Sequence, residues 1–429
     1  MPQTATPKLT VLDELAWRGL LHQQTEGLAP HLAAGARAVY CGYDPTAPSL
    51  HIGNLIPVML LVHLAKAGHR VVALVGGGTA LIGDPSGRSS ERPLLDVAAI
   101  DAQAAKIHAQ LERVFAAAGA GGVTLANNAD WLRSTALIEF LRDTGKHFSI
   151  NYMLAKDSVQ SRLEGGISYT EFSYMLLQAF DFLELNRRLG VTIQVGGSDQ
   201  WGNLTAGVEL LRRSASVEGH AFTAPLITTS SGKKFGKTEE GAVWLDGGMT
   251  SPYKFFQFWV NTEDADAERY LRMFTLRSRD DITAIGAAHA AAPHERGAQR
   301  ALARDVTTLV HGAEAARVAE EASRIVFDKK AEAAAITDAV FETLAAELPS
   351  ARFDGAELPV LDLLEQALGQ SRSAGRKLLQ QGAVTVNGVK LGADALTVPA
   401  SAAVRGRWFL VRKGGRDVAI AELRGATRA

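Results

Sequence analysis

The chain has 429 residues and a mass of 45.7 kDa, which is too long for one ordinary hydrophobic core, so two or three domains are expected. Hydrophobic residues make up 47% and charged residues 21%, the balance of a soluble globular protein. The single cysteine, Cys41, excludes an internal disulfide and a thiolate zinc cluster. The N-terminal segment carries no secretory signal and the apolar runs are too short for a membrane span, so a cytoplasmic enzyme is expected.

The net charge of −1 conceals an uneven distribution. From Arg352 to the end, twelve Lys and Arg stand against seven Asp and Glu, a balance of +5 that leaves −6 for the rest. A basic tail on an acidic body suggests that the tail meets a polyanion. A solvated basic surface without any partner would explain this charge distribution equally well.

The first two hundred residues alternate short β-branched runs with helical stretches. Residues 36–44 (ARAVYCGYD), 69–77 (HRVVALVGG) and 191–200 (VTIQVGGSDQ) are predicted to be buried strands that end in glycine. Such units in series predict an α/β fold, a Rossmann-like doubly wound parallel sheet with ligands at the carboxyl ends of its strands. At Gly76, after the second run, only glycine would let another molecule approach the backbone closely.

The second half of the chain has a different character. Residues 241–350 are rich in alanine and glutamate and are predicted to form an α-helical domain. A Pro- and Gly-containing linker, residues 348–359 (LPSARFDGAELP), is expected to open a small α+β C-terminal domain. The predicted division is therefore residues 1–240, 241–350 and 351–429.

Two short motifs carry the first sign of chemistry. His-Ile-Gly-Asn at residues 51–54 opens a helix, whose N–H groups and positive dipole end suit a phosphate, while Gly53 leaves room for a base to stack on the backbone. Lys-Phe-Gly-Lys-Thr at residues 234–238 places Lys234 and Lys237 on a Gly- and Ser-rich stretch that can move onto a triphosphate. Each motif is weak alone, but the pair in this order on this fold is a strong signal for ATP.

These motifs resemble the HIGH and KMSKS signatures of class I aminoacyl-tRNA synthetases. Over nearly its full length the chain is similar to bacterial tyrosyl-tRNA synthetases, with YCGYDPTAPSLHIGN, GDPSGRSSER, FSYMLLQAFDFL, GGSDQWGN, KKFGKT and SPYKFFQFW in that family's order. The resemblance implies a homodimer that activates L-tyrosine with ATP and then loads it onto the 3′ end of tRNA(Tyr). The chain departs from the family at Asn54 (the second histidine of HIGH), Arg88 (commonly lysine) and Phe180 (usually tyrosine), and none of these changes puts the activity in doubt.

The motif YMLLQAFD is the predicted amino-acid pocket. Tyr174, Gln178 and Asp181 stand at i, i+4 and i+7, so they share one face of an otherwise apolar helix, and three polar groups there indicate a ligand. The resemblance implies that Asp181 and Tyr40 hold the phenolic hydroxyl of the substrate. It also assigns the ammonium group to Asp84, Tyr174 and Gln178, and places Gln200 near the carboxylate. Such a pocket rejects phenylalanine because two buried groups would lose their partner.

The reaction needs position and positive charge and no side-chain nucleophile, because the tyrosine carboxylate attacks the α-phosphate of ATP. By resemblance, the catalytic residues are Thr46 and His51 at the γ-phosphate, with Lys234, Lys237, Arg88 and Arg92 completing a clamp. The expected nucleotide contacts are Cys41, Gly42, Asp44, Gly53, Asn54, Gly197, Asp199, Lys234, Phe235, Gly236, Lys237 and Thr238. Cys41 could equally be a small buried residue. Mg²⁺ is expected with the ATP, although no carboxylate cluster marks a dedicated metal site.

The C-terminal segment SRSAGRKLLQQGAVTVNGVK resembles a small RNA-binding fold known from a ribosomal protein. Its predicted helix presents Arg372, Arg376 and Lys377 beside a hairpin with Asn387-Gly388 at the turn. A basic helix edge beside a hairpin suits recognition of the backbone and shape of structured RNA. By resemblance, the preceding helical domain contacts the anticodon region.

Two other classes of function compete with this interpretation. The first is a nucleotidyltransferase of the same fold that activates a small acid without transfer to RNA, and the basic tail argues against it. The second is an inactive paralogue kept as an RNA-binding scaffold, and the presence of His51, Asp181 and Asp199 argues against that one.

Overall fold

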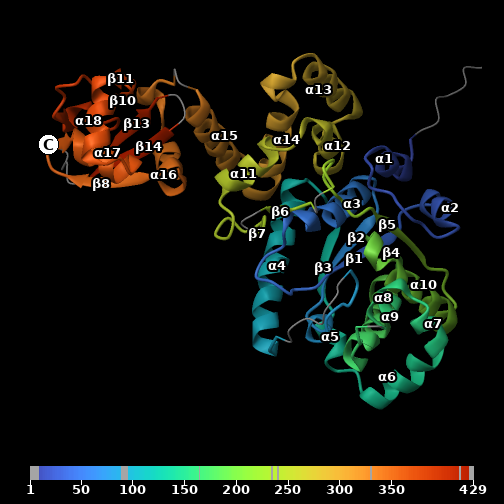
Figure 1. Ribbon diagram of the computed structural model, residues 1–429. Coiled ribbons are helices and arrows are strands. Elements are labelled where there is room, and N and C mark those ends of the chain that lie inside the picture. Colours follow the sequence, from blue (N-terminus) through green and yellow to red (C-terminus); the bar gives the residue numbers. More distant parts are fainter. Residues whose placement is uncertain are drawn as a thin grey trace, which may run out of the picture. The chain divides into compact units, whose positions relative to one another are not determined.

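The computed structural model describes residues 9–87, 95–163, 165–232, 235–238, 241–328, 331–414 and 417–424. The chain forms two compact units, Met1–Thr250 with Trp259–Val310, and Ser251–Phe258 with His311–Ala429 (Figure 1). These units divide the chain at other points than residues 240 and 350. The three-part division by role therefore stays a prediction.

The first unit is built on a five-stranded sheet in which all neighbouring strands are parallel. Its spatial order is β3-β2-β1-β4-β5. The strands are β1 (Ala38–Tyr43), β2 (Arg70–Val75), β3 (Val123–Asn127), β4 (Val191–Gly197) and β5 (His220–Ala224). The predicted parallel doubly wound sheet is confirmed, and β1, β2 and β4 are the three strands predicted from the sequence.

The strand order fixes where a ligand can bind. The chain runs outward from β1 to β2 and β3, and then returns to place β4 on the other side of β1. The connections that leave β1 and β4 therefore diverge to opposite sides and open a crevice at their carboxyl ends. Asp44 directly follows β1 and Gly197 ends β4, so both stand at this switch point.

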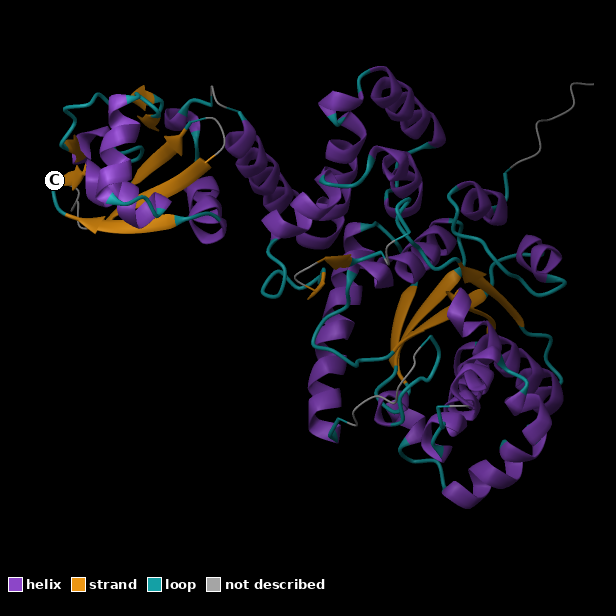
Figure 2. Cartoon of the chain, viewed as in Figure 1, coloured by secondary structure: helices purple, strands orange, loops and turns teal. Residues whose placement is uncertain are grey.

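Helices cover both faces of the sheet (Figure 2). Alternate side chains of the central strands, Tyr40 and Val72 among them, pack against Phe182 of α9 and Leu210 of α10 in one core. Strand side chains alternate between faces, so Val39 and Val71 point to the other side, where α3 contacts β1 and β2. The helices named here are α3 (Leu55–Lys66), α9 (Tyr169–Leu189) and α10 (Trp201–Ala215).

The remaining elements of the first unit surround this layer. They are α1 (Val11–Trp17), α2 (Leu28–Ala33), α4 (Val97–Ala117), α5 (Ala129–Leu132), α6 (Leu137–Asp143), α7 (Ile150–Leu154), α8 (Asp157–Leu163), α12 (Asp264–Phe274), α13 (Arg279–Ala291) and α14 (Gly297–His311), with the short strands β6 (Lys237–Thr238) and β7 (Gly241–Ala242). No helix in the described part of the chain is both long and apolar enough to cross a membrane.

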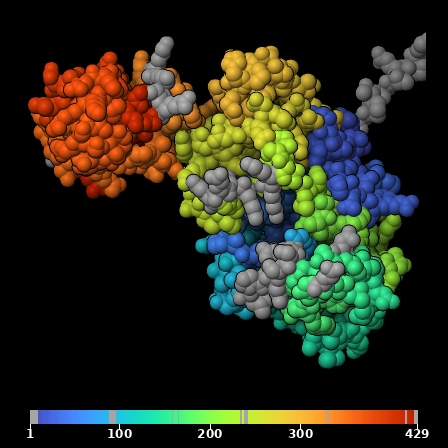
Figure 3. Space-filling view, in the orientation of Figure 1, coloured from blue at the N-terminus to red at the C-terminus, as the bar shows by residue number. Residues whose placement is uncertain are grey.

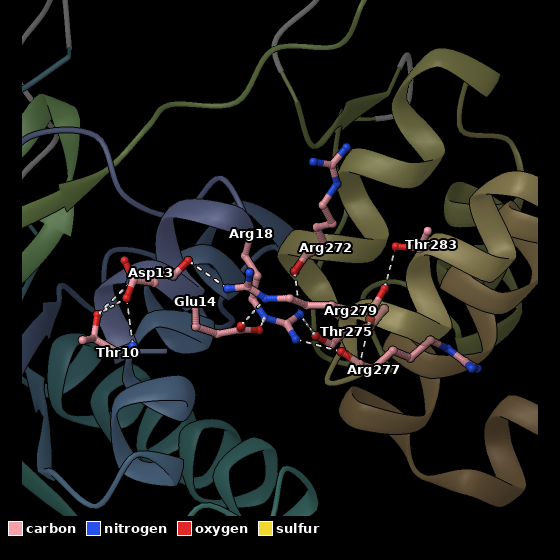
Figure 4. A network of polar contacts seen from close by, with 9 residues as sticks. All are labelled: Thr10, Asp13, Glu14, Arg18, Arg272, Thr275, Arg277, Arg279 and Thr283. Atoms are coloured by element: carbon pink, nitrogen blue, oxygen red, sulfur yellow. Dashed lines mark hydrogen bonds and ion pairs between the residues drawn. The ribbon is translucent and has the colours of Figure 1, made fainter. Parts of the chain in front are cut away.

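Arg18 ties the N-terminal helix α1 to α12 and to the loop that follows α12 (Figure 4). Its guanidinium is buried and donates to three backbone carbonyls at the end of α12 and just beyond it, those of Arg272 (2.9 Å), Thr275 (2.8 Å) and Arg277 (2.7 Å). Glu14 supplies the countercharge, with Oε1 at 2.7 Å from Arg18 Nε. A cation at a helix C-terminus satisfies carbonyls that the helix itself cannot. The single side chain therefore closes α12 and joins it to α1.

The second unit contains a mixed five-stranded sheet of order β11-β10-β13-β14-β8 and a small two-stranded sheet of β9 and β12. Its strands are β8 (Ser350–Asp354), β9 (Glu357–Pro359), β10 (Val384–Val386), β11 (Val389–Lys390), β12 (Thr397–Pro399), β13 (Trp408–Lys413) and β14 (Asp417–Arg424). Its helices are α15 (Ala313–Phe327), α16 (Asp338–Glu347), α17 (Val360–Leu368) and α18 (Arg372–Gln380), and α11 (Pro252–Val260) belongs to it through residues 252–258.

The predicted linker at residues 348–359 is wrong. It forms β8 and β9, and β8 pairs in parallel with β14. The alternating pattern of Ser-Ala-Arg-Phe-Asp buries Ala351 and Phe353 and exposes the residues between them, the mark of a half-buried strand. The flanking proline and glycine residues led to the prediction of a linker, because these residues are common in linkers. They also occur where strands begin and end.

The predicted hairpin at Asn387-Gly388 is present. β10 and β11 pair in antiparallel register, with φ of 49° at Asn387 and 83° at Gly388. Positive φ at both central residues is the requirement of a tight hairpin turn, which Asn-Gly meets at little cost. The Asn387 side chain also accepts from Leu410 N (2.8 Å) and donates to Ala402 O (2.8 Å), so it fixes the turn to β13.

Candidate active site

The first signature forms a capped turn at the start of α3. His51 Nδ1 accepts from Gly53 N (3.1 Å), and Asn54 Oδ1 accepts from His51 N (3.0 Å). Because Nδ1 is an acceptor, the neutral imidazole carries its proton on Nε2, which is then a donor. The Asn54 bond uses the amide oxygen, so its N–H groups remain as donors. The exposed His51 ring thus stands at the head of an apolar helix as an oriented donor.

Backbone hydrogen bonds join the two signatures. Ile52 N donates to Val243 O (3.0 Å), and Val243 N donates to Gly236 O (3.2 Å). The same extended segment continues with Leu245 N donating to Leu50 O (2.8 Å). Residues 243–245 therefore lie between the motifs like a short strand, and motifs 180 residues apart in sequence are brought together.

Gly236 permits this close approach, and Gly53 leaves room within the first signature. A Cβ on Gly236, where φ is +81°, would lie 3.0 Å from Ile52 Cγ1, so the second signature packs directly against the first. A Cβ on Gly53 would lie 2.8 Å from Cε1 of its own neighbour His51. Gly53 is thus required at least to leave the imidazole in place. Its expected role in receiving a base stays a prediction.

The second signature is anchored on α12. Phe235 is buried, and its ring packs against Trp259, Tyr270 and Phe274, with centroid distances of 5.9, 5.1 and 5.3 Å. Upstream, Asp266 of α12 accepts from Ser230 N (2.8 Å). Lys234, Arg88 and Arg92 lie outside the described residues, and of Lys237 and Thr238 only the backbone, in β6, is described.

The predicted pocket helix is α9, and its polar side chains turn toward the switch point. Tyr174 OH donates to Asp44 Oδ2 (2.8 Å), and Asp44 Oδ1 accepts from Thr79 Oγ1 (2.7 Å). Burial and the neighbouring carboxylates raise the pKa of Tyr174 well above its ordinary value, so it stays a donor. Asp44, expected at the nucleotide, and Tyr174, expected at the tyrosine, therefore belong to one connected site.

Asp181 lies at the floor of this site. It is 2% exposed, and its oxygens accept from Asn128 Nδ2 (2.9 Å) and Trp131 Nε1 (2.8 Å). Burial raises the pKa of Asp181 to about 8, while these two hydrogen bonds act in the opposite direction and the charge of Asp44 adds to the rise. Neither Asn128 nor Trp131 was predicted from the sequence. Both follow β3, an edge strand whose short apolar run was not recognised as a strand in the sequence.

Two buried polar atoms of the predicted pocket have no hydrogen-bond partner among the described residues. They are the Tyr40 hydroxyl on β1 and Gln178 Oε1 on α9. The charge of Asp181 contributes to raising the pKa of Tyr40, after burial itself, so Asp181 and Tyr40 act on each other. A buried polar atom without a partner costs free energy. Tyr40 and Gln178 could each take a partner from a polar ligand, and their place in the amino-acid pocket stays a prediction.

The opposite wall holds Asp84, which lies in the loop after β2. Gln200 Nε2 donates to Asp84 Oδ2 (2.7 Å), and Asn203 Nδ2 donates to Gln200 Oε1 (3.2 Å). Ser86 N also donates to Asp84 Oδ1 (2.9 Å). Two predicted residues from distant segments, Asp84 and Gln200, thus meet at the switch point.

The other predicted nucleotide contacts stand at the carboxyl ends of β1 and β4. Gly42 belongs to β1, Thr46 lies in the loop beyond it, and Gly197 and Asp199 end β4 and begin the next turn. Cys41 is buried, and burial raises the pKa of its thiol to about 12, so it remains neutral.

The glycines after β2 accommodate the chain itself. A Cβ on Gly76 would lie 1.9 Å from Asp44 Oδ1, and one on Gly77 would lie 2.5 Å from Asn127 Oδ1. The expectation that another molecule approaches the backbone here stays a prediction, because the contact that the structure shows is within the chain. The approaching group is the carboxylate of Asp44, which this turn admits into the site.

Comparison with known proteins agrees with this geometry. The family described as tRNA synthetases class I (W and Y) matches residues 33–328, and the tyrosine–tRNA ligase SYY-like C-terminal domain matches residues 340–420. A tyrosine–tRNA ligase of Anaeromyxobacter dehalogenans is 50% identical over 96% of this chain and 99% of the relative, and one of Geobacillus stearothermophilus is 47% identical over 95% and 98%. The chain belongs to the class I tyrosyl-tRNA synthetases. This family uses ATP to form tyrosyl-adenylate and charges tRNA(Tyr) with the tyrosine.

A solved structure supports the same assignment. The C-terminally truncated mitochondrial tyrosyl-tRNA synthetase of Aspergillus nidulans superposes with a TM-score of 0.68 at 34% identity, covering 75% of this chain and 95% of that one. A tyrosyl-tRNA synthetase of Archaeoglobus fulgidus, at 17% identity and a TM-score of 0.54, shares the fold. The predictions of family, fold class and reaction are confirmed.

The buried carboxyl of Asp181 predicts a pH dependence of stability. Its folded-state pKa of about 8 lies above the ordinary 3.8, so the folded state loses stability from this group as pH rises from about 4 to 8. Asp181→Asn cannot titrate. Its melting temperature minus that of the parent should therefore increase between pH 5 and pH 8, by at least about 2 °C.

Differential scanning fluorimetry across that pH range measures this difference. Asp130→Asn, at an exposed position of the same short helix as Trp131, is the matched control and should show no such trend. A difference for Asp181→Asn that stays constant from pH 5 to pH 8 would contradict the raised pKa.

Proposed function

We propose that this chain is a tyrosine–tRNA ligase whose specificity rests on Asp181 and Tyr40. The observation that carries the proposal is the buried partnerless hydroxyl of Tyr40 near Asp181, whose carboxyl is held by two donors. A phenol can donate to Asp181 and accept from Tyr40, which satisfies both at once. Phenylalanine would leave the Tyr40 hydroxyl without a partner, and a buried polar atom without a partner costs free energy. Asp181 keeps its two hydrogen bonds from Asn128 and Trp131 in either case.

The opposite end of the amino acid is assigned to the carboxylate and amide groups nearer the switch point. Asp84, Tyr174 and Gln178 surround the ammonium group, for which Gln178 Oε1 supplies an acceptor. Gln200 donates to Asp84 and stands next to where the substrate carboxylate would lie. Asp44, bonded to Tyr174, connects this end of the pocket to the nucleotide side.

The nucleotide is assigned to the two signatures. We expect the Nε2–H of His51 and the hydroxyl of Thr46 to donate to the γ-phosphate, and Lys234, Lys237, Arg88 and Arg92 to neutralise the triphosphate. We expect Asn54, Gly197 and Asp199 to bind the ribose. Cys41 either contacts the ribose or only packs beside it. The remaining expected contacts are Gly42, Asp44, Gly53, Phe235, Gly236 and Thr238.

Mg²⁺ is expected to enter the site bound to ATP. Within the described ranges, no group of three or more His, Cys, Asp or Glu side chains could hold a metal ion. We therefore assign Mg²⁺ to the substrate phosphates, where it would offset their charge. The carboxylate oxygen of tyrosine attacks the α-phosphorus, the bond to the β-phosphate oxygen breaks, and pyrophosphate leaves. A hydroxyl at the 3′ end of tRNA(Tyr) then takes the tyrosyl group and releases AMP.

Tyrosine-dependent ATP–pyrophosphate exchange tests this assignment directly. Exchange that requires tyrosine, with little response to phenylalanine, supports the proposal. Exchange with another small acid would favour a nucleotidyltransferase that serves no tRNA. Absence of exchange with intact RNA binding would favour an inactive scaffold.

The lysines of the second signature should act in the transition state. Lys234→Ala and Lys237→Ala are each expected to slow adenylate formation about 100-fold, because their charge is needed when the phosphates reorganise. Tyrosine affinity should stay within about twofold of the parent. Single-turnover activation kinetics with separate tyrosine titrations measure both quantities.

Lys106→Ala removes an exposed lysine from α4 and serves as the control. A large loss of tyrosine affinity with an intact activation rate would reverse the assignment of these lysines.

We propose that residues 351–429 bind the tRNA through α18. Arg376 and Lys377 are exposed on this helix, beside the hairpin of β10 and β11. Arg372 pairs with Asp362 of α17 (2.8 Å) and is the most restrained of the three. The division by role places ATP and tyrosine on residues 1–240 and the anticodon region on residues 241–350.

Removal of the two exposed charges of α18 should weaken tRNA binding selectively. Arg376→Ala/Lys377→Ala is expected to lower tRNA affinity about tenfold at low salt and to reduce the slope of log K against log[salt] by roughly one to two. Filter binding over a salt series measures both. Exchange activity should not change.

Arg212→Ala/Arg213→Ala removes the same charge from α10 and is the matched control. Equal losses of tRNA affinity in the two double variants would mean that total charge, and no local site on α18, governs binding.

We infer that the protein is a cytoplasmic homodimer that associates through α6 and α7. Leu137 and Ile138 of α6 are 69% and 72% exposed, and Ile150 of α7 is 60% exposed. α6 and α7 lie in the green lobe at the foot of Figure 3. Large apolar side chains that are this exposed on two helices close together in sequence support an interaction site there.

Charged residues in this surface should separate the protomers. Leu137→Glu/Ile138→Glu is expected to convert the parent dimer to a monomer in sedimentation velocity, because each carboxylate would be desolvated at the interface. Leu396→Glu, at an 81% exposed leucine of the second unit, is the control and should remain dimeric. A parent that sediments as a monomer would refute the proposal.

A further inference from the structure

A buried amide lies on α4, outside every residue assigned above. Gln110 is 3% exposed, and its neighbours on the same face of the helix are Ile107, Leu111 and Val114. An amide on an apolar face is costly unless its groups find partners. The partners of Gln110 are therefore the reason why the chain can keep it there.

Gln110 binds the loop that leads into the first signature. Its Oε1 accepts from Leu50 N (3.0 Å), and its Nε2 donates to Ser49 Oγ (3.0 Å). Ser49 is itself buried, and its hydroxyl donates to Leu50 O (2.7 Å). The backbone one residue before His51 is thus fixed from α4.

The same cluster reaches the segment that follows the second signature. Ser49 Oγ accepts from Asp246 N (3.1 Å), and Leu50 O accepts from Leu245 N (2.8 Å). Residues 245–246 are continuous with Val243, whose N–H donates to Gly236 O (3.2 Å). One buried cluster therefore holds both the chain entering the first signature and the chain leaving the second.

We propose that Gln110 is a positioning residue for ATP activation: it sets the separation of the two signatures by holding Ser49 and Leu50. This inference rests on the proposed assignment of ATP to those signatures. The hydrogen bonds described for Gln110 go to Ser49 and Leu50, so it acts on the two signatures through the backbone. Without its amide, Leu50 N–H is buried with no acceptor and Ser49 loses a partner, so the two motifs lose a shared support.

Gln110→Met tests the proposal, because methionine fills a similar volume without the amide. We expect KM for ATP to rise and the single-turnover rate of adenylate formation to fall, each about tenfold, with KM for tyrosine within twofold of the parent. A residue that only stabilises the fold would lower the active fraction and leave both KM values unchanged. Active-site titration and assay well below the melting temperature separate these cases.

Gln103→Met is the matched control on the same helix, two turns earlier. Gln103 Oε1 has no hydrogen-bond partner among the described residues, so the same substitution removes no support from either signature. Its kinetics should equal those of the parent. A KM for ATP that rises equally in Gln103→Met and Gln110→Met would overturn the proposal.

Ser49→Ala provides a second route if Gln110→Met folds poorly. It deletes one buried hydroxyl of the same cluster and should give the same selective effect on ATP. Because both residues act as one unit, the double variant should lose little more than the worse single variant. Effects that multiply would overturn the proposal.

His51→Ala separates failure of this inference from failure of the proposed function. If His51→Ala slows activation and Gln110→Met does not, the positioning role is overturned and the ATP assignment stands. If His51→Ala leaves ATP kinetics unchanged, the assignment of ATP to the first signature fails, and the inference about Gln110 falls with it.

Discussion

The site depends on one short run of backbone hydrogen bonds, those of residues 243–245. This run lies between Ile52 of the first signature and Gly236 of the second and bonds to both. Backbone bonds of this kind do not vary with side-chain rotamer, so together with the cluster of Gln110 and Ser49 they constrain the separation of the motifs. Electrostatic stabilisation of developing charge works only when donors and cations are held in advance. The backbone hydrogen bonds of residues 243–245 supply that constraint to the two signatures.

The pocket for the amino acid is governed by the opposite principle, since its key groups are left incompletely satisfied. Asp181 receives two hydrogen bonds, yet burial still raises its pKa to about 8. Tyr40 and Gln178 bring one buried atom each without a partner in the described structure. Under the proposed assignment, a ligand with a phenol and an ammonium group would remove this cost. Specificity would then come from the protein's own unsatisfied groups.

The sequence alone predicted the parts of this molecule whose signal is local. β1, β2 and β4 end in glycine after β-branched runs, and the polar stripe of α9 has helical spacing, so both were predictable. β3 and β5 lie at the sheet edges and have short runs without clear alternation, and they were missed. β8 and β9 were mistaken for a linker because Pro and Gly flank them.

The supports of the site were invisible in the sequence for a different reason. Asn128 and Trp131 matter because β3 sets them against Asp181, and Gln110 matters because α4 passes the loop at Ser49. The sequence around a single polar residue in an apolar stretch does not indicate which distant residue is its hydrogen-bond partner. Only the tertiary arrangement brings residues 50 to 200 positions apart into one hydrogen-bonded cluster, so such roles follow from coordinates and not from motif spacing.

The helical part of the first unit supports the second signature through α12. Ser230 bonds to Asp266, and Phe235 packs on Tyr270 and Phe274, so the second signature is attached to α12 on both sides of Lys234. Arg18 in turn closes the far end of α12 and joins it to α1, which contacts α3. The helix that begins at the first signature and the helix that anchors the second therefore share a support distant from the substrates. Ser230 and Phe235 flank Lys234 in sequence; Gly232 between them and Gly236 just beyond adopt left-handed backbone conformations that other residues resist. Under the proposed assignment of the two lysines to ATP, these contacts and glycines would limit how the lysines move during activation.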